Sequence, residues 1–157
     1  MITLSSDFGS PYPAAMRGVI LQRSDARLVD VAHDLPRQDV RAAAFWLREV
    51  LPWFPPATHL AVVDPGVGTD RAAVAVRAGD HWLVGPDNGV LLAAARRLAA
   101  EAGQADPDVF EWRYSDPESS TFHGRDVFAP AAATVHEAGI DDFEREDGFV
   151  EADSFAD

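Results

Sequence analysis

Short apolar runs alternate along this chain with stretches in which apolar residues recur at helical spacing. The runs at 2–5, 27–32 and 59–63 predict three buried strands. Ala15, Val19 and Ile20 predict a helix over 14–23, between the first two strands. Further helices are expected from the candidate N-cap Asp39 to about Leu51, over 90–102 and over 126–137.

Two further apolar runs, 72–78 and 81–84, flank Gly79-Asp80 and predict a β-hairpin. The alternating run 109–114 predicts an edge strand. Alternating strands and helices favour an α/β fold with three layers, an open and mostly parallel sheet, and helices on both faces. We expect one domain over residues 1–140, and an acidic tail or truncated linker over 141–157.

The sharpest break in the pattern is the turn from Asp64 to Arg71, which follows the apolar run 60–63. Ligands of open α/β sheets bind at the carboxyl ends of strands, where Asp64 is expected to lie. A tight glycine turn there can bring the Asp64 carboxylate and the Arg71 guanidinium over one crevice. A plain hairpin turn with a surface ion pair explains the same spacing, and the residues alone leave both interpretations open.

Three other polar turns end strands or precede helices in the predicted fold. They are Ser6-Asp7-Phe8-Gly9, Pro86-Asp87-Asn88-Gly89 and Thr121-Phe122-His123-Gly124-Arg125-Asp126. Each alone is common turn chemistry, because Asp, Asn and Gly favour turns. Together with the turn after Asp64, on one edge of a sheet, they would form a polar crevice.

Composition narrows the function classes. The 157 residues carry a formal net charge of -13, which disfavours nucleic acid as a partner. All basic residues are Arg, and such an acidic surface without Lys is typical of adaptation to high salt, so we expect a halophilic source. Cysteine is absent, and no apolar run approaches membrane-spanning length, so we expect a cytoplasmic protein without disulfides or membrane contact. The five His residues lack a compact ligand spacing, and no metal or cofactor is expected.

The four turns belong to a longer series of motifs by which the chain resembles the S-adenosyl-L-methionine (SAM) hydroxide adenosyltransferases. This family of SAM hydrolases is related to the fluorinases and chlorinases. The matching motifs run in order over nearly the whole chain: Ser6-Asp7-Phe8-Gly9, Met16-Arg17-Gly18-Val19, Val29-Asp30-Val31-Ala32-His33, Val63 through Thr69, Pro86-Asp87-Asn88-Gly89 and Ser119 through Asp126.

The resemblance implies that water or hydroxide attacks the ribose 5′ carbon of SAM, giving adenosine and L-methionine. The family residues that position and activate the water correspond to Asp64, Arg71 and His123. The ribose-binding carboxylate corresponds to Asp7, and Phe8, Asn88 and Phe122 are expected to line the substrate pocket. The resemblance also implies a homotrimer, a small-molecule nucleoside substrate, and no metal.

Two features depart from the family pattern. The loop Ser10–Ala15 is about two residues shorter than usual and holds no acidic residue, although the family uses it for the amino-acid end of SAM. The chain also ends where the family's C-terminal β-barrel would begin. We therefore expect weak hydrolysis, or none, from this chain alone.

Two alternatives remain open. The chain could be a non-catalytic nucleoside-binding or oligomerisation domain of the same fold, or a metal-dependent phosphohydrolase using Asp7, Asp64 and His123. Other residues have simpler interpretations. His33 and Asp34 are expected to shape a turn, and the aromatic residues Phe45, Trp46, Trp53 and Phe54 are expected in the core or in subunit contacts.

Overall fold

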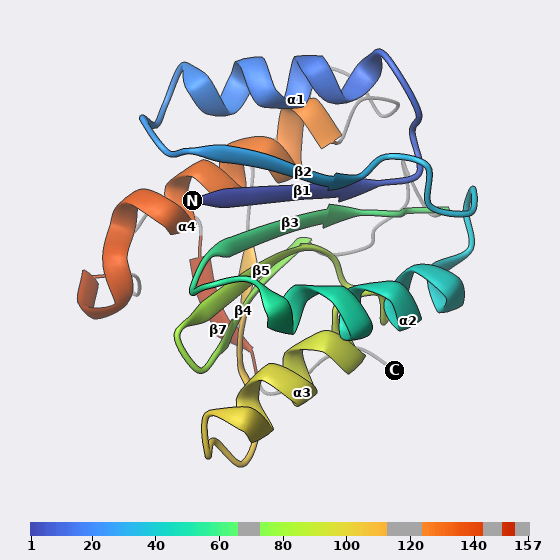
Figure 1. Cartoon of the computed structure of the whole chain (residues 1–157). Helices are drawn as coiled ribbons and strands as arrows, with labels where there is room; N and C mark the ends of the chain where they lie inside the picture. The colour runs from blue at the N-terminus through green and yellow to red at the C-terminus, as the bar shows by residue number, and fades with distance from the viewer. Residues whose placement is uncertain (66–72, 113–123, 143–148, 153–157) are drawn as a thin grey trace.

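The computed structural model describes residues 1–65, 73–112, 124–142 and 149–152, and these form one mixed sheet with helices on both faces (Figure 1). The strands are β1 (Ile2–Ser6), β2 (Leu28–Ala32), β3 (Thr58–Val62), β4 (Ala73–Ala78), β5 (His81–Pro86), β6 (Asp108–Trp112) and β7 (Phe149–Ala152). The helices are α1 (Tyr12–Leu21), α2 (Val40–Val50), α3 (Leu92–Glu101) and α4 (Ala129–Asp142), with a 3-10 turn η1 (Leu51–Trp53) and a π-helical turn η2 (Gly124–Phe128).

The described strands lie in the order β2-β1-β3-β5-β4-β6-β7. The four strands β2, β1, β3 and β5 are parallel. The expected hairpin is confirmed, because β4 pairs antiparallel with β5 around a turn at Gly79, whose φ is 60°. β6 and β7 continue the sheet antiparallel. The predicted three-layer α/β fold is thus confirmed, with its parallel part confined to four strands.

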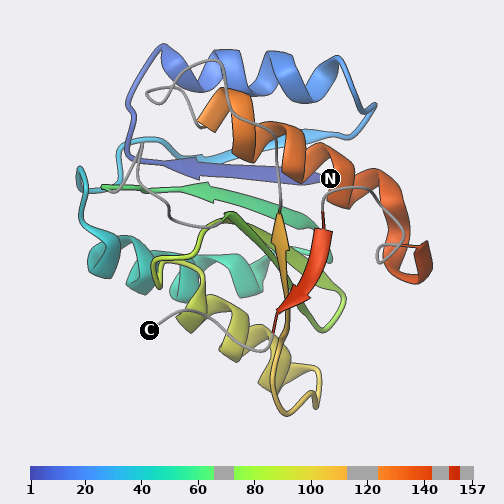
Figure 2. The ribbon, with the colours of Figure 1, turned by 180° about the vertical axis from the view of Figure 1, so that it is seen from behind.

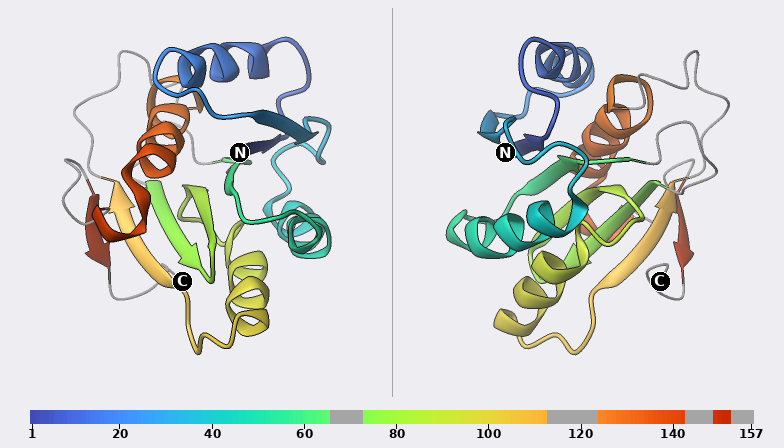
Figure 3. Two further views of the ribbon diagram at one scale, coloured as in Figure 1. Left: turned by 60° about the vertical axis from the view of Figure 1, so that its left-hand side comes forward. Right: turned by 90° about the vertical axis from the view of Figure 1, so that its right-hand side faces the viewer.

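Alternate residues of the strands divide the core between the two faces of the sheet. In β3, Leu60 and Val62 face the cluster that contains α1 and α4 residues. Ala61, with Val63 just after the strand, faces the cluster that contains α2 and α3 residues. The left view of Figure 3 shows α4 on one side of the sheet and α2 with α3 on the other, and Figure 2 shows α4 from behind. This two-residue alternation explains why a sheet covered on both faces has strands that are apolar throughout.

The chain reverses its direction of winding between β1 and β3. β1 leads through α1 to β2 on one side, and β2 leads through α2 to β3 on the other side of β1. Asp39 caps α2 as expected, because its carboxylate accepts a hydrogen bond from the Ala42 amide at 3.0 Å. Crevices that bind ligands form outside the carboxyl ends of strands at such a switch point.

Two expectations about the C-terminal third need correction. The 109–114 run is not an edge strand, because β6 lies between β4 and β7. The acidic segment after residue 140 is not wholly a linker either, since α4 continues to Asp142 and Phe149–Ala152 form β7. Long-range pairing with β6 forms this last strand. Four residues flanked by an acidic segment are too short to carry a clear local strand signal.

Candidate functional site

Two carboxylates lie at the carboxyl ends of the strands that flank the switch point. Asp7 directly follows β1, and Asp64 comes two residues after β3. The last residue of β1, Ser6, pairs with Val62 at the end of β3, so the two strands end together. The structure therefore brings the neighbourhoods of Asp7 and Asp64 to one edge of the sheet, as the sequence motifs predicted.

The Asp7 carboxylate is held from one side. Its Oδ2 atom accepts a hydrogen bond from the backbone amide of Gln38 at 2.6 Å. Gln38 has a φ of 58°, an unusual conformation for a residue other than glycine, and it directly precedes the cap of α2. A carboxylate has about four acceptor positions, so one backbone contact leaves capacity for a ligand hydroxyl.

Asp64 is buried, with 8% of its surface exposed. The segment that leads to it is fastened by Asn88, whose side-chain amide donates to the Val63 carbonyl at 2.8 Å. The Oδ1 atom of Asn88 accepts from the Val90 amide at 3.0 Å, at the start of the connection to α3. Asn88 was predicted to line a substrate pocket, and its described contacts show that it ties the end of β3 to the turn after β5.

Phe8, which follows Asp7, packs against the core at the same edge of the sheet. Its ring meets Tyr12 in an edge-to-face contact with a centroid distance of 4.9 Å. A Cβ atom on Gly124 would lie 3.2 Å from atoms of Phe8, Tyr12 and Met16, so the chain passes close against these side chains where η2 begins. The Tyr12 hydroxyl accepts a hydrogen bond from the Arg125 amide at 2.8 Å. Burial raises the pKa of Tyr12 despite this hydrogen bond, which keeps the phenol protonated.

Three predicted site residues, Arg71, Phe122 and His123, lie outside the described residues. Their described neighbours along the chain are Ala73 and Gly124. Ala73 pairs with Pro86, at the same edge as the Asn88 turn. Gly124 lies against Phe8, and η2 also contacts β3 and β5. Single-turn π-helices are frequent at functional sites.

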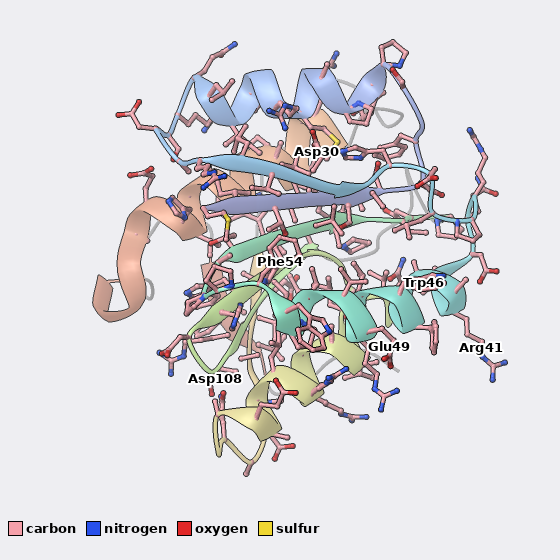
Figure 4. The ribbon with its side chains drawn as sticks, in the orientation of Figure 1. Asp30, Arg41, Trp46, Glu49, Phe54 and Asp108 are labelled. Carbon is pink, nitrogen blue, oxygen red and sulfur yellow. The ribbon has the colours of Figure 1, made fainter. Side chains whose placement is uncertain are left out.

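A cavity of about 490 Å³ lies beside this edge, between α1 and the end of β2. It is lined by the loop residues Gly9, Ser10, Pro11, Pro13 and Ala14 and by the polar residues Arg17, Asp30, His33 and Asp34. Arg17 donates to Asp30 at 2.8 Å, and Figure 4 labels Asp30 on the side of β2 that faces α1. Burial opposes ionisation, but the hydrogen bond from His33 and the Arg17 charge hold the pKa of Asp30 below its usual value.

The sequence-based expectations missed the roles of Arg17, Asp30 and Gln38 and assigned His33 only a turn. For Arg17, Asp30 and His33 the available signal was their position in motifs shared with the resembled family, Met16 to Val19 and Val29 to His33. Gln38 lies in neither motif, and no sequence signal marked it. Within the described residues, no group of three or more His, Cys, Asp or Glu side chains is placed to hold a metal ion. In the same part of the chain, no helix combines the length and apolarity needed to cross a bilayer.

Residues 2–144 match the N-terminal domain of the SAM hydroxide adenosyltransferases. This chain belongs to that family. The protein named (R)-S-adenosyl-L-methionine hydrolase from Salinispora tropica is 47% identical over 137 residues, covering 85% of this chain and 52% of that protein. The protein of the same name from Methanocaldococcus jannaschii is 37% identical over 143 residues, covering 86% and 52% respectively. The chain thus spans about half the length of the curated relatives it matches.

Solved structures confirm the family fold. An uncharacterized conserved protein from Thermotoga maritima superposes with a TM-score of 0.82 at 34% identity, covering 99% of this chain and 60% of that one. A conserved hypothetical protein from Thermus thermophilus gives a TM-score of 0.76 at 40% identity, with the same coverage. The resemblance carried by the six motifs is confirmed by the family match and by the curated relatives.

Proposed function

We propose that this chain carries the ribose and nucleophile half of a site that hydrolyses SAM to adenosine and L-methionine. The observation that carries the proposal is the placement of Asp7 and Asp64 at the adjoining ends of β1 and β3, in a family whose curated relatives are named SAM hydrolases. The switch point between these strands is where an α/β sheet of this order accepts a nucleoside.

Asp7 binds the two ribose hydroxyls in this proposal. The Gln38 amide holds its Oδ2 atom, and the remaining acceptor positions are those proposed to bind the ligand. Two hydroxyls bound by one carboxylate orient the sugar ring. Since the reacting 5′ carbon is attached to that ring, orientation of the ring aligns the carbon with the nucleophile.

Asp64, Arg71 and His123 hold the attacking water. An oxygen–carbon bond forms at the ribose 5′ carbon while the carbon–sulfur bond breaks, and its electron pair neutralises the sulfonium to a thioether. The leaving group needs no proton, so the only proton to move is one from the water. The burial of Asp64 favours this step, because a poorly solvated carboxylate accepts a proton or strong hydrogen bond more readily.

The 490 Å³ cavity is the proposed place for the amino-acid end of SAM. The short loop Ser10–Ala15 has no acidic residue that could bind the methionine ammonium group. Asp30 from β2 and Asp34 from the turn after it line the same cavity as that loop. Since Arg17 in the same lining pairs with Asp30, Asp34 is the carboxylate proposed to supply the missing negative charge.

The oligomer and the remaining half of the site belong to the same proposal. The matched relatives are about twice as long as this chain, and we propose that adenine is enclosed by residues outside the matched half and by a homotrimer. Because the chain is acidic and contains no Lys, we propose that it works in a salt-rich cytoplasm. Sedimentation of the chain at high salt tests the trimer.

The decisive experiment incubates this chain with SAM and measures adenosine and methionine by chromatography. We expect slow, equimolar release that Asp64→Asn abolishes and that a chelator leaves unchanged. Adenosine binding without any product would favour the non-catalytic binding domain instead. Loss of activity on chelation would favour the metal-dependent phosphohydrolase and contradict the proposal.

A further inference from the structure

A continuous chain of polar side chains runs from the surface of α1 to the buried end of β1. Arg17 donates to one oxygen of Asp30 at 2.8 Å, and the other oxygen of Asp30 lies 2.8 Å from the Nε2 atom of His33. The Nδ1 atom of His33 lies 2.7 Å from the hydroxyl of Ser6. Ser6 has no exposed surface and directly precedes Asp7.

The chemistry of the groups assigns the direction of these hydrogen bonds. An ionised Asp30 only accepts, so the Nε2 atom of His33 carries a proton and donates it to Asp30. In the neutral ring, Nδ1 then accepts from the Ser6 hydroxyl. The Ser6 oxygen in turn accepts from the Phe8 amide at 3.4 Å. With a neutral His33 ring, the donors all point along one line, from Phe8 through Ser6 and His33 to Asp30.

The backbone of the same two segments is joined as well. The Gly9 amide donates to the His33 carbonyl at 2.7 Å, and the Leu35 amide donates to the Ser6 carbonyl at 3.3 Å. Asp7 lies between Ser6 and Gly9, the two residues that make these backbone hydrogen bonds. Its carboxylate accepts a hydrogen bond from the amide of Gln38, which follows Leu35 by three residues. His33 is thus the point at which the loop Ser6–Gly9 is attached to the segment that reaches Asp7 from the other side.

We propose that His33, supported by Asp30 and Arg17, is a positioning residue that sets the orientation of the Asp7 carboxylate toward the ribose. This inference rests on the proposed function, because it takes Asp7 to be the ribose-binding group. His33 acts through Ser6 and the loop backbone, as groups outside the first contact layer orient ligating side chains in other sites. Arg17, Asp30 and His33 also line the 490 Å³ cavity, so the groups that hold Asp7 face the proposed amino-acid subsite.

The test compares adenosine with 2′,3′-dideoxyadenosine, which lacks both hydroxyls that Asp7 would bind. Calorimetry with the chain is expected to show tighter binding of adenosine. In His33→Ala, adenosine affinity falls by about tenfold, as is usual when an outer-layer partner is removed, while affinity for the dideoxy compound changes little. Asp7→Asn gives the same selective loss, and the double variant adds nothing further because both changes disable one contact.

Matched variants separate positioning from folding. Asp30→Asn retains an acceptor oxygen for His33 and keeps most of the preference for adenosine, whereas Asp30→Ala loses it. Arg17→Met removes only a partly exposed cation and produces a smaller loss. Arg97→Ala, which removes ion pairs to Glu101 on α3 and to Glu49 on α2, is the control and leaves the preference unchanged.

A second measurement needs no ligand. Amide hydrogen exchange at Phe8 and Gly9 is expected to accelerate in His33→Ala while exchange at Leu4, inside β1, stays slow. Unchanged exchange at Phe8 and Gly9, or a full preference for adenosine in His33→Ala, would overturn the inference and leave the proposed function standing. If the unaltered chain fails to prefer adenosine over the dideoxy compound, the ribose role of Asp7 is wrong, and the inference falls with it.

Discussion

The side-chain amide of Asn88 donates a hydrogen bond to the carbonyl of Val63 at 2.8 Å, across the boundary between β5 and β3. Val63 is the residue directly before Asp64. The Oδ1 atom of the same side chain accepts a hydrogen bond from the Val90 amide at 3.0 Å. Asn88 thus links the residue before Asp64 to the segment that leads into α3. One asparagine therefore fixes the backbone that presents the buried carboxylate.

Replacement of this asparagine tests that function. Asn88→Ala removes both hydrogen bonds and leaves the Val63 carbonyl without this donor, so the free energy of unfolding is expected to fall by about 1–2 kcal/mol. Urea unfolding measures the loss. Asn88→Asp keeps an acceptor for Val90 but places a carboxylate against the Val63 carbonyl, and it should be no more stable than Asn88→Ala. Full stability in either variant would contradict the assigned contacts.

Gly124 provides a packing test at the start of η2. A methyl group there would lie 3.2 Å from Phe8, Tyr12 and Met16, which is tighter than ordinary contact, so Gly124→Ala is expected to destabilise the fold by about 1–3 kcal/mol. Gly18, inside α1, is the matched control, because a methyl group there would meet no neighbour within 4 Å. Gly18→Ala should stabilise by about 0.5–1 kcal/mol through helix propensity. Thermal unfolding measures both variants. Equal shifts of the thermal midpoint in Gly124→Ala and Gly18→Ala would contradict the tight packing around Gly124.

Stability is expected to depend on pH through a buried histidine far from the site. His59 lies in β3 with 1% of its surface exposed, between Thr3 at 2.7 Å and His81 at 2.9 Å. Burial, aided by the neighbouring His81, lowers the pKa of His59 to about 3. In the unfolded chain the imidazole recovers its ordinary pKa of about 6.5. Between these two values only the unfolded chain holds the proton, so acid favours unfolding.

Urea unfolding between pH 7 and pH 5 measures this effect. The free energy of unfolding should fall as pH falls, and His59 contributes at most about 1.4 kcal/mol per pH unit. His59→Gln should reduce the slope, although His81 and His136 retain part of it because burial lowers the pKa of each. Equal slopes in the variant and the unaltered chain would show that His59 binds protons as readily in the folded state as in the unfolded state, contrary to this prediction.

Salt should stabilise this protein. With a formal net charge of -13, the folded chain repels itself, and the range of that repulsion shrinks from about 10 Å at 0.1 M salt to about 3 Å at 1 M. We expect the thermal midpoint to rise steadily with sodium chloride over that range. A midpoint that stays constant or falls would show that the ion pairs of the native surface outweigh the net charge.

Local signals predicted the elements of this fold well. Gly79-Asp80 between two apolar runs indicated the hairpin, and Asp39 indicated the start of α2, because turns and caps depend on a few adjacent residues. The aromatic residues were harder to place. Trp53 is 84% exposed, with Phe45 and Trp46 about half exposed, so these three are not core residues. Hydrophobicity alone cannot tell which apolar side chains the sheet will cover.

The chain's motifs were sufficient for the family, the α/β class and the strand ends that carry Asp7, Asp64 and Asn88. These features are encoded by residues adjacent in sequence, and periodicity and turn chemistry act over a few positions. Only the tertiary structure decided that His33 hydrogen-bonds to Ser6, that Asn88 donates to the Val63 carbonyl, and that β7 pairs with β6. Such contacts join residues about 25 or more positions apart, and strand order and register, which no local pattern specifies, bring them together.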